Sequence, residues 1–485
     1  MNIGKKLSTF GLAVLVLFMV SCKKDAIEPT TQIGADTLST SVVQFSSINA
    51  WIYEVMQDAY FWSKQMPAQA TLNANANPAD YFEKLIYQRA TVDRFSGITD
   101  DIESLQKEFN GISKIFGIQY QLAAVDQNQS NIGLFLSYVV KGSPAEAAGL
   151  KRGDIIMKVN GQALTTSNYA TLLRSSDNIN FTLGKLDGTA LVADDQKSIN
   201  LTKAEVSENP VGFSAVIDKS KYGKKIGYLV YTQFVPGTDA SPNVYDDQLR
   251  KIFGDFKAQG VNELVLDLRF NGGGYISSAE TLASLIGKNI STSKVFYKEQ
   301  WNENYTAYYQ KQDGPNALNH TFINEPNNIG ANLNRVFVLT SQGTASASEL
   351  VINGLKPYMS VITVGDHTYG KNLFGTLVSD DKKRWNWGMY VMLGQTANAN
   401  GESDYGNVNG IAPAYKVDDT VIPFRSFGDD NETLFSKVLN IMGIPASTTA
   451  RVGTTARVTP LSGEFLKDNL QTGDKRMIKD FSSLR

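Results

Sequence analysis

The chain has 485 residues, of which 42% are hydrophobic and 19% are charged, and its formal net charge is −2. This length predicts several domains, and the composition is that of a globular protein rather than a disordered one. The near-neutral charge gives no electrostatic case for binding nucleic acid. One cysteine excludes an internal disulfide, and two histidines without a cysteine partner disfavour a zinc site. No metal or other cofactor is expected.

The first 22 residues have the pattern of an export signal. Two lysines, Lys5 and Lys6, precede an apolar run over 10–20 that is too short to span a bilayer comfortably. The run ends at Cys22, in a context that resembles a bacterial lipoprotein cleavage site. We expect cleavage before Cys22 and lipidation of this residue, which would anchor an exported protein to the cell envelope, on the periplasmic side or at the outer membrane. A plain signal peptide with an incidental cysteine is the alternative.

Two segments of different composition follow the signal. Residues 23–46 are polar and predict a flexible tether. Residues 47–110 predict a small helical domain, because apolar side chains recur there at helical spacing. The first such set comprises Trp51, Ile52, Val55, Met56, Ala59 and Tyr60. A second set follows Asn77-Pro78. These aromatic stripes are more simply core than a cofactor pocket.

Residues 111–204 predict a β-rich domain. Three short β-like stretches occur, and a helix with Ser143 as N-cap and Pro144 at its first position lies between the last two. The run from Gly142 through Gly153-Asp154 to Asn160-Gly161 resembles a PDZ domain. This resemblance implies capture of a peptide C-terminus along a sheet edge, with the carboxylate held near Phe116, Gly117 and Ile118. A purely structural β-domain without an open groove is the alternative.

Residues 205–445 predict an α/β layered domain. Apolar strands over 226–231, 263–269, 336–340 and 360–365 alternate with segments of helical pattern. The strands are almost continuously apolar, which is typical of a sheet covered on both faces. Residues 446–485 are rich in Thr, Ser, Arg and Lys and predict a C-terminal tail, in which the sequence shows no recognisable catalytic or binding motif.

A run of three glycines follows the second of these strands. In Asp267-Leu-Arg-Phe-Asn-Gly-Gly-Gly-Tyr275, glycine lets backbone amides approach a partner closely. No Gly-Lys-Ser/Thr sequence follows, so the run does not fit a nucleotide-binding P-loop. Taken alone, a tight strand-to-helix turn explains it equally well.

Ser346 stands between a buried strand and a helix. Together with Glu349 it fits a capping box, so its simplest role is an N-cap. The other role is that of a nucleophile at a helix N-terminus, where the helix dipole and free amides would stabilise an oxyanion. Small residues at Ala345 and Ala347 would leave room for a substrate backbone.

Lys371 follows the next strand, in His367-Thr-Tyr-Gly-Lys371. A serine needs a base to become a nucleophile, and a lysine can serve when burial lowers its pKa enough to leave it neutral. A solvated surface lysine is the alternative. A Ser-His-Asp triad through His367 is another, although the chain has no Gly-x-Ser-x-Gly elbow.

Together these segments resemble the C-terminal processing proteases, peptidase family S41. The glycine run, Ser346-Ala-Ser-Glu349 and Gly370-Lys371 occur in the family's order, and Gly410-Ile-Ala-Pro413 is similar to a further family motif. The resemblance implies a multidomain α/β fold with a small N-terminal helical domain, a PDZ-like β-rich domain and a ClpP/crotonase-like protease domain.

The resemblance also implies roles for individual residues. Ser346 would be the nucleophile and Lys371 the general base of a serine endopeptidase, with an oxyanion hole formed by the amides of Gly273 and Ala347. The partners of the protein would be proteins or peptides with apolar C-termini. The sequence does not indicate the oligomeric state. One position departs from the pattern: Gly375 stands where many members have a Gln that orients the lysine. A catalytically inactive, lipid-anchored peptide-binding module is therefore the rival hypothesis.

Overall fold

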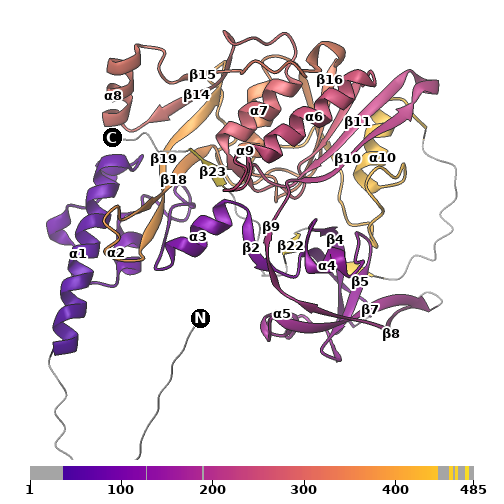
Figure 1. Cartoon of the computed structure of the whole chain (residues 1–485), viewed down its shortest axis with the longest axis horizontal. Helices are drawn as coiled ribbons and strands as arrows, with labels where there is room; N and C mark the ends of the chain where they lie inside the picture. The colour runs from indigo at the N-terminus through magenta and orange to yellow at the C-terminus, as the bar shows by residue number, and fades with distance from the viewer. Residues whose placement is uncertain are drawn as a thin grey trace, which may run out of the picture.

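A computed structural model gives the structure of the chain. It describes residues 36–126, 128–187, 190–445, 458–461, 465–467 and 476–479, with side chains from Phe45 onward, Arg476 excepted. Cys22 and the predicted signal lie outside these residues. Figure 1 shows helices α1 and α2 at one end of the molecule, a β-rich domain at the other and a larger α/β domain between and above them. This arrangement confirms the prediction of a multidomain α/β protein with a helical N-terminal region.

The N-terminal region is built on α1 (Asp36–Ala59) and α2 (Pro78–Leu85). Ile52, Met56 and Tyr60, from the predicted stripe, are fully buried. Asn77 caps α2 by accepting a hydrogen bond from the Ala79 amide at 2.9 Å. The predicted tether over 23–46 is wrong from Asp36 on, because helix α1 already begins there. The sequence carries Leu38, Val42 and Phe45 at helical spacing, and Phe45 packs against the core.

The PDZ-like domain has the predicted order of elements. Its strands and helices are β3 (Ile118–Ala124), β4 (Ile132–Val139), α4 (Pro144–Ala147), β5 (Ile155–Val159), β6 (Gln162–Ala163), α5 (Tyr169–Arg174), β7 (Asn178–Asp187) and β8 (Ala190–Thr202). Ser143 caps α4 and Asn160-Gly161 turns with positive φ at both residues, as predicted. Strand β2 (Ile112–Ile115) enters the domain and pairs antiparallel with β9 (Ala204–Ser207), which leaves it.

The α/β domain contains two sheets. The first has the order β10-β11-β12-β16-β17-β20, and the second has the order β13-β23-β18-β19-β14-β15. The strands of the first sheet are β10 (Val211–Lys219), β11 (Lys224–Tyr231), β12 (Glu263–Asp267), β16 (Arg335–Thr340), β17 (Ser360–Gly365) and β20 (Tyr415–Lys416). Those of the second are β13 (Gly273–Tyr275), β14 (Val295–Trp301), β15 (Asn319–Thr321), β18 (Leu373–Ser379), β19 (Gly388–Asn398) and β23 (Arg476–Ile478). Parallel pairing of β11, β12, β16 and β17 confirms the predicted βαβ rhythm.

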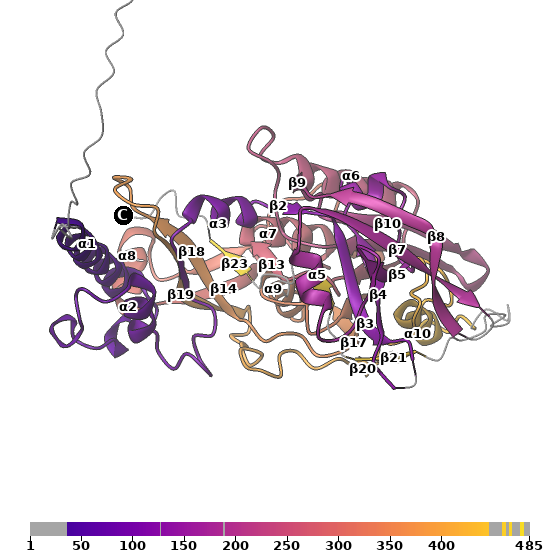
Figure 2. The ribbon, with the colours of Figure 1, turned by 90° about the horizontal axis from the view of Figure 1, so that it is seen from below.

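Helices cover both faces of the first sheet. They are α6 (Val244–Ala258), α7 (Ile276–Ile286), α9 (Ala347–Leu355) and α10 (Thr433–Ile441). Every residue of α9 is buried, so the helix that follows Ser346 lies inside the domain. Figure 2 shows β23, at the C-terminal end of the colour scale, among the strands of the second sheet close to α9.

A buried ionic cluster joins the PDZ-like and α/β domains. Arg269 is fully buried and contacts Asp267 at 2.7 Å, Asp419 at 2.6 Å and Glu432 at 2.8 Å. Arg152, from the PDZ-like domain, contacts Glu432 at 3.0 Å. Separation of the two domains would break the ion pair between Arg152 and Glu432 and leave Arg269 as the only one of these two arginines beside Glu432.

The predicted C-terminal tail, 446–485, contains short strands in its described parts. Strands β21 (Thr459–Pro460) and β22 (Leu466–Lys467) pair with β3 of the PDZ-like domain. Strand β23 lies between β13 and β18 of the α/β domain. The polar composition of 446–485 hides these strands, because each has only two or three residues and pairs with strands distant in sequence.

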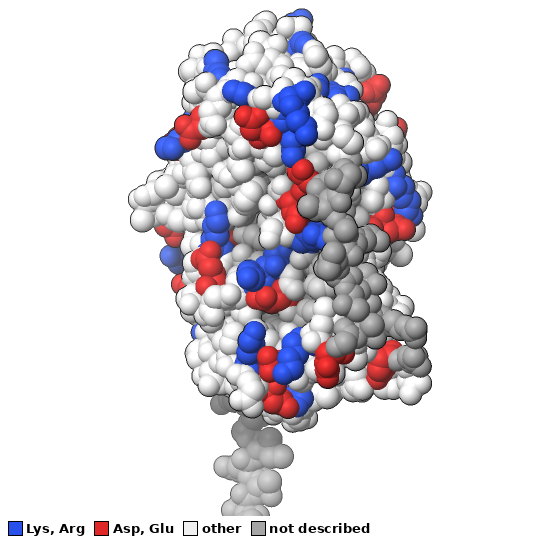
Figure 3. Space-filling view, turned by 90° about the vertical axis from the view of Figure 1, so that its right-hand side faces the viewer, with Lys and Arg blue, Asp and Glu red and all other residues white. Residues whose placement is uncertain are grey.

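The surface shows no segregation of charge on the face drawn in Figure 3. Basic and acidic side chains are interspersed there over both domains. Among the residues that the structure describes, no helix combines the length and the apolar character needed to cross a membrane.

Candidate active site

The three segments singled out in the sequence meet at one end of the first sheet. Strands β12 and β16 are parallel neighbours, so the chain leaves both at the same edge. There the Ala345 amide donates to the carbonyl of Asn271, in the glycine segment, at 3.1 Å. The Tyr369 amide, in the lysine segment, donates to the Thr344 carbonyl at 2.9 Å. The backbone itself therefore joins the segments that carry Ser346, Lys371 and the glycines.

Ser346 has a strained backbone. Its φ is +64° and its ψ −112°, a region that residues other than glycine rarely adopt. The side chain is fully buried, and Oγ makes no hydrogen bond within the described residues. Ser346 and Glu349 stand in the arrangement of the predicted capping box, but the N-cap role does not account for the strained backbone, because an N-cap residue usually has extended φ and ψ.

Glu349 holds the serine and lysine segments together. One carboxylate oxygen accepts from the amides of Ser346 at 2.7 Å and Lys371 at 2.9 Å. The other accepts from the Gly370 amide at 2.7 Å and from the Thr368 hydroxyl. Burial raises the pKa of Glu349 to about 7, although these four donors favour its charged form. Glu349, the carboxylate of the predicted capping box, thus bonds both to the N-terminus of α9 and to the segment that carries Lys371.

Lys371 is fully buried, so the alternative of a solvated surface lysine is wrong. Its Nζ donates to the hydroxyl of Tyr390, on β19, at 3.1 Å, and lies 4.9 Å from the ring centroid of Phe95. The Tyr390 hydroxyl in turn donates to the carbonyl of Met477, on β23, at 2.9 Å. Among the described residues, the rings of Phe95 and Tyr390 and the Tyr390 hydroxyl therefore lie next to the amine.

The structure explains the glycine at 375. A Cβ built there would lie 2.4 Å from the carbonyl oxygen of Val391 and 3.0 Å from the ring of Tyr390. No side chain fits, so a Gln at this position could not reach Lys371. Tyr390 supplies the polar contact instead. Sequence reasoning missed Tyr390, because it enters from the neighbouring strand and no motif contains it.

The glycine run forms a strand and a turn into α7. Gly274 has φ +141°, and a Cβ there would lie 2.1 Å from the carbonyl oxygen of Phe234. The backbone that approaches the glycines closely is therefore that of Phe234, which pairs with Gly274. The Gly273 amide, predicted for the oxyanion hole, donates to Asn271 Oδ1 at 2.8 Å. In this conformation that amide is engaged. Ala347, predicted as the second donor, is the first residue of α9.

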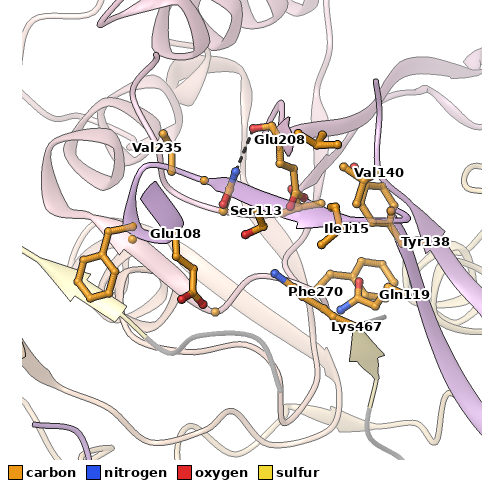
Figure 4. Close-up of a pocket in the computed structure, with 18 of the residues that line it drawn as sticks. Glu108, Ser113, Ile115, Gln119, Tyr138, Val140, Glu208, Val235, Phe270 and Lys467 are labelled. Carbon is orange, nitrogen blue, oxygen red and sulfur yellow. Dashed lines mark hydrogen bonds between the residues drawn. The ribbon is translucent and has the colours of Figure 1, made fainter. Parts of the chain in front are cut away.

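The predicted carboxylate loop of the PDZ-like domain faces the same region. Phe116 is fully buried, and Gly117 turns with φ +95°. A cavity runs from Gly117 and Ile118 to Gly273 and is drawn in Figure 4, where Lys467 lies beside Gln119 and Phe270. Strands β21 and β22 pair antiparallel with the edge of β3. The chain's own strands therefore occupy this edge of β3, while the cavity beside it stays open.

The histidine alternatives find no support. His367 Nδ1 lies 2.8 Å from the carbonyl oxygen of Thr368, and Ser346 Oγ has no hydrogen-bond partner within the described residues, so no triad is formed. His320 lies 3.0 Å from Glu299, on β14. Over the described ranges, no group of three His, Cys, Asp or Glu residues could hold a metal ion.

The segment around Gly410 packs against the backbone just before Lys371. The Ile411 amide donates to Thr368 Oγ1 at 2.7 Å, and the Thr368 amide donates to the Ile411 carbonyl at 3.1 Å. A Cβ at Gly410 would lie 2.2 Å from the Thr368 carbonyl oxygen, so only glycine permits this approach. The fourth predicted motif thus packs against the backbone that carries Lys371.

Comparison with known proteins agrees with this architecture. Residues 225–417 match peptidase family S41, residues 47–97 match the peptidase S41 N-terminal domain, and residues 135–184 match a PDZ domain. A carboxyl-terminal-processing protease of Synechocystis sp. is 29% identical over 239 residues, 49% of this chain and 49% of that protein. A chloroplastic C-terminal processing peptidase of Tetradesmus obliquus is 27% identical over 301 residues, 58% of this chain and 56% of that protein.

The chain spans about half the length of the curated relatives it matches. A crystal structure from Bacteroides fragilis, assigned to the S41 proteases, is 29% identical and covers 81% of this chain and 97% of its own, with a TM-score of 0.68. The matched segments coincide with the N-terminal helical region, the PDZ domain and the α/β domain. Together they show that this chain belongs to peptidase family S41.

Proposed function

We propose that the protein is a serine endopeptidase in which Ser346 is the nucleophile and Lys371 the general base. The observation that supports it best is the strained, buried Ser346, whose amide shares one carboxylate oxygen with the amide of Lys371. Strain of this kind persists where the surroundings enforce it, and it occurs most often at functional sites. A scaffold that only bound peptides would need neither the strain nor the shared carboxylate.

The proposed reaction needs no metal or cofactor. Lys371, which must be neutral to act as a base, takes the proton of Ser346 as Oγ attacks the scissile carbonyl carbon. The tetrahedral intermediate collapses, the C–N bond breaks, and the new amine leaves with the proton from Lys371. Water then attacks the acyl-enzyme, again with Lys371 as base, and releases the acid. Tyr390 is a positioning residue that orients Nζ through the 3.1 Å hydrogen bond.

The oxyanion would be held by backbone amides. The Ala347 amide, at the N-terminus of α9, is the first donor, and the helix dipole adds to it. The Gly273 amide becomes the second donor only when Asn271 releases it, since Asn271 Oδ1 now accepts from it. The active conformation therefore differs from the present one at the glycine segment.

Substrate recognition falls to the PDZ domain in this proposal. An extended polypeptide would add to the edge of β3, with an apolar C-terminal residue in the groove and its carboxylate near Gly117. The lipid anchor on Cys22, and with it the location in the bacterial cell envelope, rests on the sequence pattern alone.

The test is cleavage of an unfolded reporter protein that ends in apolar residues. Ser346→Ala and Lys371→Ala should each abolish cleavage, whereas Ser293→Ala and Lys382→Ala, at exposed positions, should leave it unchanged. Retained cleavage in Ser346→Ala would exclude the proposed nucleophile.

A peptide-binding module without catalysis is the second candidate. The engaged Gly273 amide and the unbonded Ser346 Oγ favour it, because neither is arranged for reaction here. Binding of the reporter without cleavage, by the parent chain and by Ser346→Ala alike, would support it.

A further inference from the structure

We propose that the C-terminal segment of the chain, in its described parts 458–461, 465–467 and 476–479, is the resident ligand of two substrate-binding positions. One position is the edge of β3 in the PDZ domain, and the other is the strand position beside β13. An incoming polypeptide must displace this segment from both. The inference rests on peptide binding by the PDZ domain, as in the proposed function, but not on catalysis.

At the PDZ domain the segment binds as a peptide ligand would. Thr459 pairs with Ala124 and Lys467 with Gln119, antiparallel, so the segment runs toward the carboxylate loop at Gly117. The Leu461 amide adds a hydrogen bond to the Leu122 carbonyl at 3.0 Å. Strand addition in this direction is the way in which PDZ domains hold peptides.

Leu466 supplies the apolar contact that such a ligand needs. Its side chain is partly buried against the core of the PDZ domain, as is Tyr169 of α5. Leu172 and Leu173, also from α5, belong to the same core cluster. By contrast, the side chain of Leu461 is 36% exposed. Leu466 is therefore the apolar contact of the segment with the core beside α5, whereas the neighbouring Phe465 packs against Phe270 and Phe424.

In the α/β domain the segment lies beside the glycine strand. Strand β23 pairs parallel with β13, with Gly274 opposite Met477, and Met477 is fully buried. The Tyr390 hydroxyl donates to the Met477 carbonyl at 2.9 Å, and the Lys479 amide donates to the Gly375 carbonyl at 3.0 Å. The occupant of this position thus bonds to the side chain that orients Lys371.

The buried carboxylate of Glu299 anchors the end of the segment. Lys479 Nζ pairs with it, and His320 lies 3.0 Å away. Burial alone would raise the pKa of Glu299, but His320 and Lys479 lower it to about 2. A buried carboxylate held in its charged form by a residue of this segment shows that β23 fills a prepared position.

The contacts are those of an exchangeable ligand. Strands β21 and β22 have two residues each and β23 has three, so each contributes few ladder hydrogen bonds. Covalent attachment compensates, because a tethered ligand acts at an effective concentration of order millimolar. A free peptide must overcome that concentration, and loss of one anchor contact from the segment should let it bind more tightly.

The first experiment measures fluorescence anisotropy of a labelled synthetic peptide with the sequence of residues 458–467. It uses the full chain with Ser346→Ala, so that cleavage plays no part. Adding Leu466→Ser should tighten binding of the peptide by about tenfold, the loss expected for one partly buried leucine. Leu461→Ser, in the same segment but exposed, should match the parent within about twofold. Equal affinity in the parent and in Leu466→Ser would overturn the inference.

A second experiment fixes the segment in place. Gln119 and Lys467 are Cα partners across β3 and β22, so Gln119→Cys with Lys467→Cys should form a disulfide. The oxidised chain should bind the peptide at least about tenfold more weakly than the same chain after reduction. A disulfide that leaves binding unchanged would contradict the inference. If no variant binds the peptide at all, the inference fails, while hydrolysis by Ser346 can still be tested separately.

Discussion

The two halves of the candidate site are held in different ways. The Ser346 and Lys371 segments are fixed by one buried carboxylate, Glu349, which accepts hydrogen bonds from both. The glycine strand and the PDZ groove are instead completed by the short strands β21, β22 and β23 from the end of the chain. The Ser346 and Lys371 segments are thus held by contacts between themselves, whereas the glycine strand and the PDZ groove are held by strands from the end of the chain.

This difference indicates which half must change when substrate binds. A carboxylate buried among four donors cannot release one of them without leaving an unsatisfied polar group. A two-residue strand can be replaced by another strand that makes the same hydrogen bonds. We therefore expect the glycine strand and the groove to rearrange around a fixed nucleophile and base.

The largest effect is expected from Glu349→Gln. In Gln, an NH₂ group replaces one of the two carboxylate oxygens, so two N–H or O–H donors lose their acceptor. We expect the free energy of unfolding to fall by about 4 kcal/mol for these two donors. Urea unfolding should show this loss, and cleavage of the reporter should fall to background because the Ser346 and Lys371 segments separate. The matched control is Glu303→Gln, an exposed carboxylate on the surface. Wild-type stability in Glu349→Gln would show that the carboxylate does not hold the two segments.

The same residue predicts a pH dependence. Burial raises the pKa of Glu349 to about 7, above its unfolded value of 4.5. Its contribution to stability is thus fully present below the unfolded pKa and is lost as pH rises through about 7. The loss should be about 3 kcal/mol, and it should be visible as the difference between parent and Glu349→Gln in unfolding free energy from pH 4 to pH 8. Parallel pH curves would contradict this assignment.

A smaller loss is expected from Gly274→Ala. The added Cβ would lie 2.1 Å from the Phe234 carbonyl oxygen, so β13 must move, and we expect about 3 kcal/mol of destabilisation. Gly401→Ala is the control, because φ is also positive there, at +86°, but nothing lies within 4 Å. The difference between the two variants in thermal unfolding isolates the clash. Equal shifts would mean that backbone conformation alone requires glycine.

The sequence predicted the fixed half of the site and missed most of the exchangeable half. Ser346, Glu349 and Lys371 stand in compact motifs that end strands of a parallel sheet, so their approach follows from topology. Tyr390 could not be predicted, because it lies on β19, an antiparallel strand of the second sheet that no motif marks. Its hydroxyl makes the hydrogen bond to Lys371 that a Gln at position 375 would be expected to make.

The occupied groove was equally beyond the sequence. The core positions of the PDZ domain, its Ser143 cap and its Asn160-Gly161 turn follow from local signals. Pairing of Leu466 with Tyr120 joins residues far apart in the chain, and a two-residue strand carries no periodicity. The predicted start of the helical domain at 47 was late for a related reason: the polar residues after Asp36 conceal a weak helical stripe.

Tyr390→Phe tests the link between the two halves. Loss of the hydroxyl removes the hydrogen bond that orients Lys371 and the one to Met477. We expect kcat to fall by about 10- to 100-fold with KM nearly unchanged, and the pH profile of kcat/KM to shift. Tyr405→Phe is the control, since that tyrosine is also buried but its hydroxyl lies 3.4 Å from Thr396 Oγ1. Equal losses in both variants would indicate a packing effect.

The smallest effect is expected from Lys479→Met, which loosens β23 without touching Ser346 or Lys371. Removing the ion pair with Glu299 should let the labelled peptide of residues 458–479 bind about fivefold more tightly, whereas Lys294→Met, at an exposed position, should have no effect.

The same variant should change acid stability, because the pKa of Glu299, now lowered to about 2, should rise. A carboxyl group whose pKa is lowered in the folded state stabilises the fold above its unfolded pKa, and this stability is lost as pH falls toward 2. Lys479→Met should therefore unfold at a higher pH in acid than the parent. Unchanged peptide binding together with reduced acid stability would mean that Lys479 stabilises the fold but does not hold an exchangeable strand.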